Sequence, residues 1–88
     1  MIAQQVTVVN PLGLHARAAA RFVNIASRFQ SQIRVGRGQQ TMDGKSILGL
    51  LLLAAARGSD LKISADGTDE QEALAALVAL VARGFEDQ

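Results

Sequence analysis

The stretch NPLGLHAR at residues 10–17 marks the point where the hydrophobic pattern of this chain changes from that of a strand to that of a helix. Before it, the side chains of residues 2–9 alternate with a period of two, and one of the two resulting faces is more apolar than the other. This pattern is typical of a half-buried strand. After it, apolar residues recur every three or four positions from Ala16 to Phe29, which indicates an amphipathic helix. We therefore predict a strand and a helix, joined by a loop that contains the only proline, Pro11.

Strand-like and helix-like hydrophobic patterns also follow one another in the rest of the chain. Alternating segments at residues 32–35 and 39–42 predict a hairpin, and a third such segment at residues 61–65 predicts a fourth strand. The apolar run at residues 47–56 predicts a second helix, for which Ser46 is a suitable N-cap.

A third helix is predicted from Thr68-Asp69-Glu70-Gln71, which matches a capping box, to Arg83-Gly84. The expected order is strand, helix, strand, strand, helix, strand, helix. One sheet can bury all of these apolar faces, so we expect an α+β fold. Its architecture is a two-layer, open-faced sandwich in which three helices cover one face of a four-stranded antiparallel sheet.

Length and composition restrict the kind of protein. With 88 residues, of which 49% are hydrophobic, the chain is long enough for one core, so we expect a single domain over residues 1–88. The absence of cysteine excludes disulfides and thiol chemistry, and one histidine offers no multi-histidine metal site. We expect neither a metal nor a cofactor.

Charge and hydropathy also argue against two classes of partner. A net charge of +1 and an aromatic content of 3% leave little with which to bind nucleic acid. The longest apolar run, residues 50–56, is far shorter than the roughly 20 residues that span a membrane. No basic, signal-like segment precedes it. We therefore expect a cytoplasmic protein without membrane insertion.

The single histidine, His15, stands where the loop ends and the predicted helix begins. A helix start leaves backbone N–H groups unpaired, here those of Ala16, Arg17 and Ala18, and carries about half a positive charge, so it stabilises a bound anion. An imidazole titrates near neutral pH, so enough of it is unprotonated to attack phosphorus. The planar guanidinium of Arg17 can hold two phosphate oxygens at once. These features predict a phosphoryl-accepting site, although a lone histidine is more often structural and an arginine on a helix is often merely solvated.

The second predicted helix carries more leucine than one buried face needs. If Ile47, Leu50 and Ala54 face the sheet, Leu48 and Leu52 lie on roughly the opposite side. An exposed leucine patch indicates a docking surface, and self-association or an unusual core would also account for it.

Two motifs, GLHAR at residues 13–17 and GKSILGL at residues 44–50, closely resemble the histidine-containing phosphocarrier proteins, HPr, of the bacterial phosphoenolpyruvate-dependent phosphotransferase system. The similarity extends over essentially the whole chain. It implies that His15 accepts a phosphoryl group on Nδ1 from Enzyme I and passes it to a histidine of an Enzyme IIA domain, in sugar uptake and regulation. Arg17 would steady the phosphate. The protein would then be a stoichiometric carrier without a cofactor, and not an enzyme with turnover.

The same resemblance implies a regulatory role for Ser46, the position that HPr kinase/phosphorylase modifies in many members of the family. Chemistry alone requires no more of Ser46 than a helix cap. The resemblance also implies a monomer that has Ile47 and Leu48 in the patch that docks its partners. The residues expected in that docking surface are Arg21, Asn24, Ile47, Leu48, Gly49 and Leu52.

Two departures from the family pattern leave alternatives open. Relatives usually have proline immediately after the active-site arginine, where this chain has Ala18, which keeps its N–H. Residues 72–80 and 84–87 look more like the nitrogen-regulatory paralogue, NPr. A nitrogen-branch protein, or a purely regulatory domain that acts by protein–protein interaction, is therefore the alternative to a sugar-branch carrier. A nucleic-acid-binding domain is a more distant one.

Overall fold

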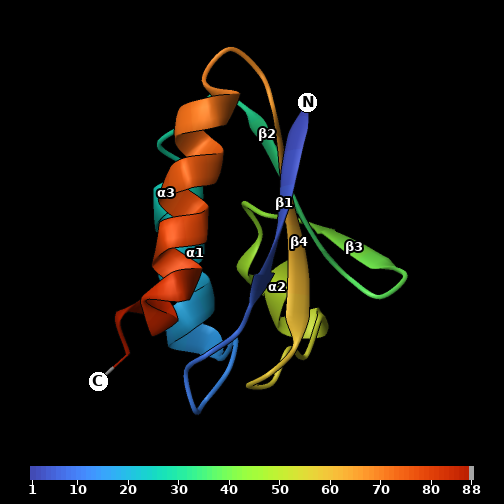
Figure 1. Cartoon of the computed structure of the whole chain (residues 1–88), viewed down its shortest axis with the longest axis vertical. Coiled ribbons are helices and arrows are strands. Elements are labelled where there is room, and N and C mark those ends of the chain that lie inside the picture. The colour runs from blue at the N-terminus through green and yellow to red at the C-terminus, as the bar shows by residue number, and fades with distance from the viewer. Residues whose placement is uncertain (88) are drawn as a thin grey trace.

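A computed structural model describes residues 1–87 and confirms the predicted order of strands and helices (Figure 1). The elements are β1 (Ile2–Thr7), α1 (Ala16–Ala26), β2 (Gln32–Arg37), β3 (Gln40–Asp43), α2 (Ile47–Leu52), β4 (Asp60–Asp66) and α3 (Glu70–Ala82), followed by a short 3-10 helix, η1 (Gly84–Glu86). The strands form one antiparallel sheet in the order β1-β4-β2-β3. The three α-helices cover one face of this sheet, so the predicted open-faced sandwich is confirmed.

The core lies between the sheet and the helices. Val35 of β2 and Ile63 of β4 are paired in register, and both side chains point into the helical layer, where they are buried. Removing one such side chain from water stabilises the fold by about 1.5–3 kcal/mol, which makes this layer the main source of stability. The other large side chains that are fully buried are Val8, Phe22, Ile33, Leu50, Leu53, Leu61, Leu77, Leu80, Val81 and Phe85.

Helix α1 is shorter than its apolar pattern predicts, because it ends at Ala26 and not near Phe29. The chain tightens after Ala26, where the backbone N–H of Phe29 donates to the carbonyl of Ala26 at 3.2 Å. The ammonium group of Lys45 then binds the carbonyl of Phe29 at 2.8 Å. None of the helices within residues 1–87 has the length and apolarity needed to cross a membrane.

Helix α2 also ends early, at Leu52, although the apolar run continues to residue 56. Ala54 adopts a φ of 51°, in the left-handed region, which stops the helix. Arg37 of the neighbouring hairpin donates to the carbonyl of Leu53 at 3.2 Å. A tertiary contact, and not local propensity, therefore holds the end of this helix.

The early end of α2 changes which of its residues face the core. Leu50 and Leu53 are fully buried, whereas Ile47 is 42% exposed and Ala54 also faces solvent. The expectation that Ile47 and Ala54 face the sheet is therefore wrong, because the six-residue helix presents only one side to the core.

The capping box predicted for α3 is wrong as well. Asp69, not Thr68, is the N-cap residue, and its side chain makes no capping bond to α3. Its carboxylate instead accepts hydrogen bonds from the backbone N–H groups of Gln30 and Ser31, at 2.8 and 2.9 Å, and from the hydroxyl of Ser31. The bond from that hydroxyl is the main reason why the pKa of Asp69 lies below its ordinary value. The carboxylate thus connects the start of α3 by hydrogen bonds to the segment before β2. Local sequence spacing does not predict such a long-range contact.

Candidate functional site

The loop between β1 and α1 is held in place by contacts at both of its ends. Asn10 is buried, and its Nδ2 donates to the carbonyl of Gly13 at 2.8 Å. Gly13 has a φ of 66°, a left-handed conformation that suits glycine. The next residue, Leu14, is buried, and its N–H donates to the carbonyl of Ala55 at 2.9 Å. The loop therefore presents the following histidine from a fixed backbone.

His15 is the N-cap of α1, as its place at the loop–helix boundary predicts. Its Nδ1 accepts a hydrogen bond from the backbone N–H of Arg17 at 3.2 Å, and its Nε2 lies 2.7 Å from Oδ2 of Asp87. Since a backbone N–H can only donate, Nδ1 must present a lone pair, and the ring proton resides on Nε2. The side chain is 23% exposed. The arrangement thus places an unprotonated ring nitrogen at the positive end of a helix.

Asp87 is a site residue that sequence reasoning missed. Its carboxylate accepts hydrogen bonds from His15 and from Nδ2 of Asn10, the latter at 2.8 Å, and lies 3.3 Å from the guanidinium of Arg21. The bond from His15 is the largest cause of a pKa for Asp87 below its ordinary value. Asn10 and Arg21 lower this pKa further, whereas partial burial opposes them. No local pattern links Asp87 with a histidine 72 positions earlier, so only the fold reveals this contact.

The first turn of α1 offers donors for an anion. Among residues 1–87, no acceptor pairs with the backbone N–H of Ala16 or Ala18, and the N–H of Arg17 is occupied only by Nδ1 of His15. The methyl group of Ala18 is completely buried. The side chain of Arg17 borders a small cavity of about 240 Å³, with Pro11, Leu12 and Asp87 as its other walls.

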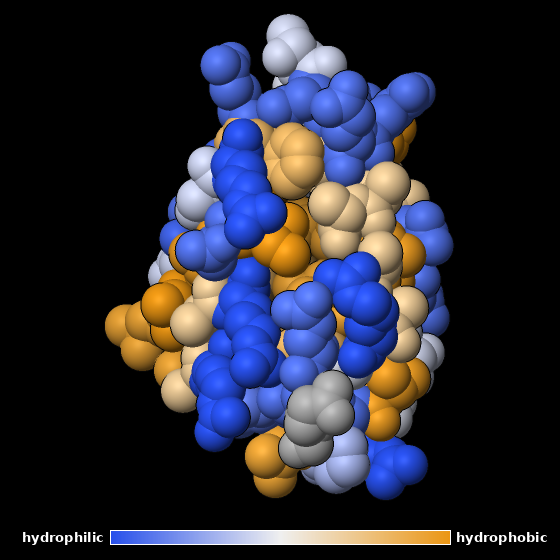
Figure 2. Space-filling view, turned by 90° about the vertical axis from the view of Figure 1, so that its left-hand side faces the viewer, coloured by the Kyte–Doolittle hydropathy of each residue, from blue (hydrophilic) through white to orange (hydrophobic). Residues whose placement is uncertain are grey.

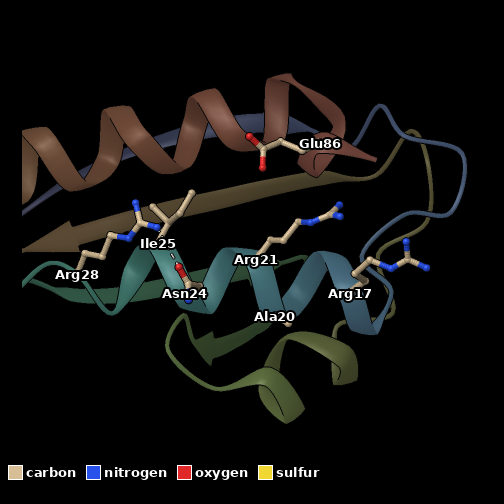
Figure 3. A pocket seen from close by; sticks show the side chains of 7 residues that line it. All are labelled: Arg17, Ala20, Arg21, Asn24, Ile25, Arg28 and Glu86. Carbon is tan, nitrogen blue, oxygen red and sulfur yellow. Dashed lines mark hydrogen bonds between the residues drawn. The ribbon is translucent and has the colours of Figure 1, made fainter. Parts of the chain in front are cut away.

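A groove runs along α1 from this cavity, and Figure 3 shows its lining. Arg17 and Arg21 of α1 and Arg28, just beyond its end, follow one another along one wall, and Glu86 lies on the opposite wall. Arg21 is not free, since it also donates to the carbonyl of Phe85 at 2.9 Å. The volume of the groove is about 290 Å³. On the face seen in Figure 2, hydrophilic side chains form a band with hydrophobic groups beside it.

The second helix exposes an apolar patch that consists of Ile47, Leu48, Leu51 and Leu52. Leu48 and Leu52 are 68% and 59% exposed, so the prediction that these two face solvent is confirmed. Ser46 begins this helix as predicted, because its Oγ accepts a hydrogen bond from the N–H of Gly49 at 3.0 Å. The patch, its serine cap and the histidine site all lie in the helical layer.

Fold and site together define a class of protein, namely a small α+β sandwich that presents a histidine at the start of its first helix. The family model described as "PTS HPr component phosphorylation site" matches residues 2–83. The chain therefore belongs to the HPr family of phosphocarrier proteins of the phosphotransferase system.

Individual relatives support this assignment over nearly the full length. The phosphocarrier protein HPr of Pseudomonas aeruginosa is 48% identical over 88 residues, which is 99% of this chain and 98% of the relative. The crystal structure of HPr-C-His from Thermoanaerobacter tengcongensis superimposes with a TM-score of 0.95 at 42% identity and covers 100% of this chain and 99% of its own. Crh, a catabolite-repression protein of Bacillus subtilis, matches with a TM-score of 0.78 at 42% identity, over 96% of this chain and 97% of its own. The Crh structure is described as a dimer with a swapped domain.

Proposed function

We propose that this chain is a stoichiometric phosphoryl carrier. Nδ1 of His15 accepts a phosphoryl group, derived from phosphoenolpyruvate, from Enzyme I and passes it to a histidine of an Enzyme IIA domain. The observation that carries this proposal is the hydrogen bond from the N–H of Arg17 to Nδ1, because it requires a lone pair on that nitrogen. Membership of the HPr family supports it.

The chemistry needs few groups from this chain. The Nδ1 lone pair forms a bond to phosphorus while the bond from phosphorus to the donor atom of Enzyme I breaks, and that electron pair stays with the donor. The N–H of Arg17 can then donate to a phosphoryl oxygen in place of Nδ1. The N–H groups of Ala16 and Ala18 lie in the same helix turn, where an anion is stabilised.

Incubation with Enzyme I and phosphoenolpyruvate tests the proposal. Intact-mass spectrometry should report one added phosphate that is lost in acid and retained in alkali, as a phosphohistidine is. No change of mass would overturn the carrier function.

We expect Arg17→Lys to slow phosphoryl transfer about tenfold, because an ammonium group cannot hold two oxygens in the planar geometry of a guanidinium. The thermal midpoint should hardly move, since the side chain of Arg17 is exposed. Transfer rates from Enzyme I and to Enzyme IIA are the measurement. Arg28→Lys, two residues beyond the end of α1, is the control and should leave both rates unchanged. Equal rates for both variants would remove Arg17 from the mechanism.

We further propose that the apolar patch on α2 docks both partners of a cytoplasmic, monomeric carrier. Leu48 and Leu52 are large and exposed on a helix that packs against α1, and such patches mark protein interfaces. Gly49 lies directly beside Ser46, since a Cβ at this position would come within 3.3 Å of Oγ of Ser46. Arg21 and Asn24 of α1, which line the groove of Figure 3, are proposed as further docking residues, and each also makes a hydrogen bond to another side chain.

Ser46 is proposed as a regulatory phosphorylation site for an HPr kinase/phosphorylase. We expect Ser46→Asp to leave the fold intact, because Asp also accepts from the N–H of Gly49 and its charge suits a helix start. Phosphorylation of His15 by Enzyme I should nevertheless weaken, since the new charge would stand beside the docking patch and meet an acidic partner surface. The apparent affinity for Enzyme I is the measurement.

Ser46→Ala separates charge from capping. It removes the hydroxyl at a cost of about 1 kcal/mol of stability without adding charge, so transfer should stay as it is in the natural chain. If Ser46→Asp and the natural chain accept phosphate with the same affinity and rate, Ser46 is only a helix cap.

A further inference from the structure

We propose that Asp87 is a positioning residue for phosphoryl transfer, which acts through Nε2 of His15. Its carboxylate keeps the ring proton on Nε2 before transfer and retains it there while Nδ1 carries phosphorus. The first half of this inference concerns the free protein, and the second half rests on the proposed carrier function.

The contact is made by a carboxylate whose two oxygens are both held. Oδ2 accepts from His15 at 2.7 Å and from Asn10 at 2.8 Å, and Oδ1 faces Arg21 at 3.3 Å. The side chain of Asp87 is only 11% exposed, and Asn10 is 4% exposed. A carboxylate that is held at both oxygens can fix the orientation of an imidazole ring. A surface carboxylate that rotates freely cannot do so.

The backbone before Asp87 adopts an energetically unfavourable conformation that brings Asp87 to the histidine. Gly84, Phe85 and Glu86 have φ values of 67°, 56° and 61°, and two of these three left-handed residues carry a side chain. This conformation is unfavourable for residues other than glycine and persists only where the surroundings hold it. Phe85 is completely buried, and Arg21 binds its carbonyl. The fold itself therefore sets the position of Asp87, which does not depend on the bond to His15.

The proton on Nε2 has a defined part in the transfer. When the Nδ1 lone pair bonds to phosphorus and Nε2 keeps its hydrogen, the ring becomes a cation, and the carboxylate of Asp87 compensates this charge. When the acceptor histidine of Enzyme IIA attacks phosphorus, the Nδ1–P bond breaks and its electron pair returns to Nδ1. The ring is then neutral again, with the same proton on Nε2. No proton enters or leaves in either step, and the cationic ring is the better leaving group.

On electrostatic grounds alone, the negative charge of Asp87 would have the opposite effect and repel the incoming phosphoryl group. The geometry favours the supporting role. The carboxylate contacts Nε2 directly, whereas the phosphoryl group would be attached to Nδ1 at the other side of the ring, and Arg17 and Arg21 lie close by. The two effects have opposite signs, so rates distinguish them.

The first experiment examines the unphosphorylated chain with its histidine ring labelled with ¹⁵N. In the natural protein the Nε2 proton should give a direct ¹H–¹⁵N signal, because the hydrogen bond slows its exchange with water. The signal should disappear in Asp87→Ala and in a chain that ends at Glu86. Glu86→Gln is the matched control, since Glu86 contacts Arg83 and not His15, and it should keep the signal. A signal that persists in Asp87→Ala would overturn the inference.

The second experiment charges His15 chemically, with phosphoramidate, so that no protein partner is needed. We expect Asp87→Asn, which removes the charge and keeps the size, to slow both the gain of phosphate and its later loss to water, on the order of tenfold at neutral pH. Equal or faster rates in Asp87→Asn, with Enzyme I still charging the natural chain, would overturn the inference and leave the carrier function intact. If Enzyme I fails to charge the natural chain while the Nε2 signal depends on Asp87, the carrier function fails and the positioning of the ring stands.

Discussion

His15→Ala is expected to fold like the natural chain and to accept no phosphate from Enzyme I. The nucleophile is lost, and no other side chain in the loop or the first turn of α1 can replace an unprotonated ring nitrogen. The variant also loses the hydrogen bond that caps α1, which costs about 1 kcal/mol. Intact mass after incubation with Enzyme I and phosphoenolpyruvate, together with a thermal unfolding curve, measures both effects.

His15→Asn serves as the control for the cap. The amide oxygen of Asn accepts from the N–H of Arg17 as Nδ1 does, so the stability lost in His15→Ala should return while phosphorylation stays absent. Loss of the fold in both variants would make His15 a structural residue. An added phosphate in either would place the site elsewhere.

Gly13→Ala is expected to lower the free energy of unfolding by about 2–4 kcal/mol, the largest stability effect we anticipate. A Cβ at this position would lie 2.5 Å from the carbonyl oxygen of Ala55, the same atom that accepts from the N–H of Leu14. Neither backbone can move without disturbing the other, and the left-handed φ adds its own cost. Chemical denaturation measures the change, and slower phosphorylation of His15 should accompany it because the loop shifts.

Gly38→Ala isolates the conformational cost. Gly38 has a similar φ of 60°, but a Cβ there would meet nothing within 4 Å. This variant should lose only about 1 kcal/mol. Equal losses for Gly13→Ala and Gly38→Ala would mean that the contact with Ala55 is unimportant.

The order of elements is predictable because strand alternation and helical periodicity are properties of neighbouring residues. The end of α2 is not, since it depends on Arg37, which lies 16 positions before Leu53 in the sequence. Asp69 illustrates the same limit. Its position before α3 fits a local cap, yet its carboxylate binds Gln30 and Ser31 across the molecule.

The same distinction between local and long-range contacts applies to the residues of the candidate site. His15, Arg17 and Ser46 can be selected from sequence because each stands at the start of a predicted helix, where chemistry and position coincide. Asp87 and Asn10 cannot, because the contact between them spans 77 positions and exists only once α3 and η1 have returned the chain to the loop. Of the two hydrogen bonds made by the imidazole, the one to Asp87 therefore cannot be predicted until the fold is known.

The most direct test of the account identifies the ring nitrogen that carries phosphorus. His15 labelled with ¹⁵N in both ring positions is phosphorylated by Enzyme I and phosphoenolpyruvate, and NMR correlates each nitrogen with the ring protons and with ³¹P. We predict that phosphorus is coupled to Nδ1 and that Nε2 carries a proton. Phosphorus on Nε2, or on any residue other than His15, would contradict the account.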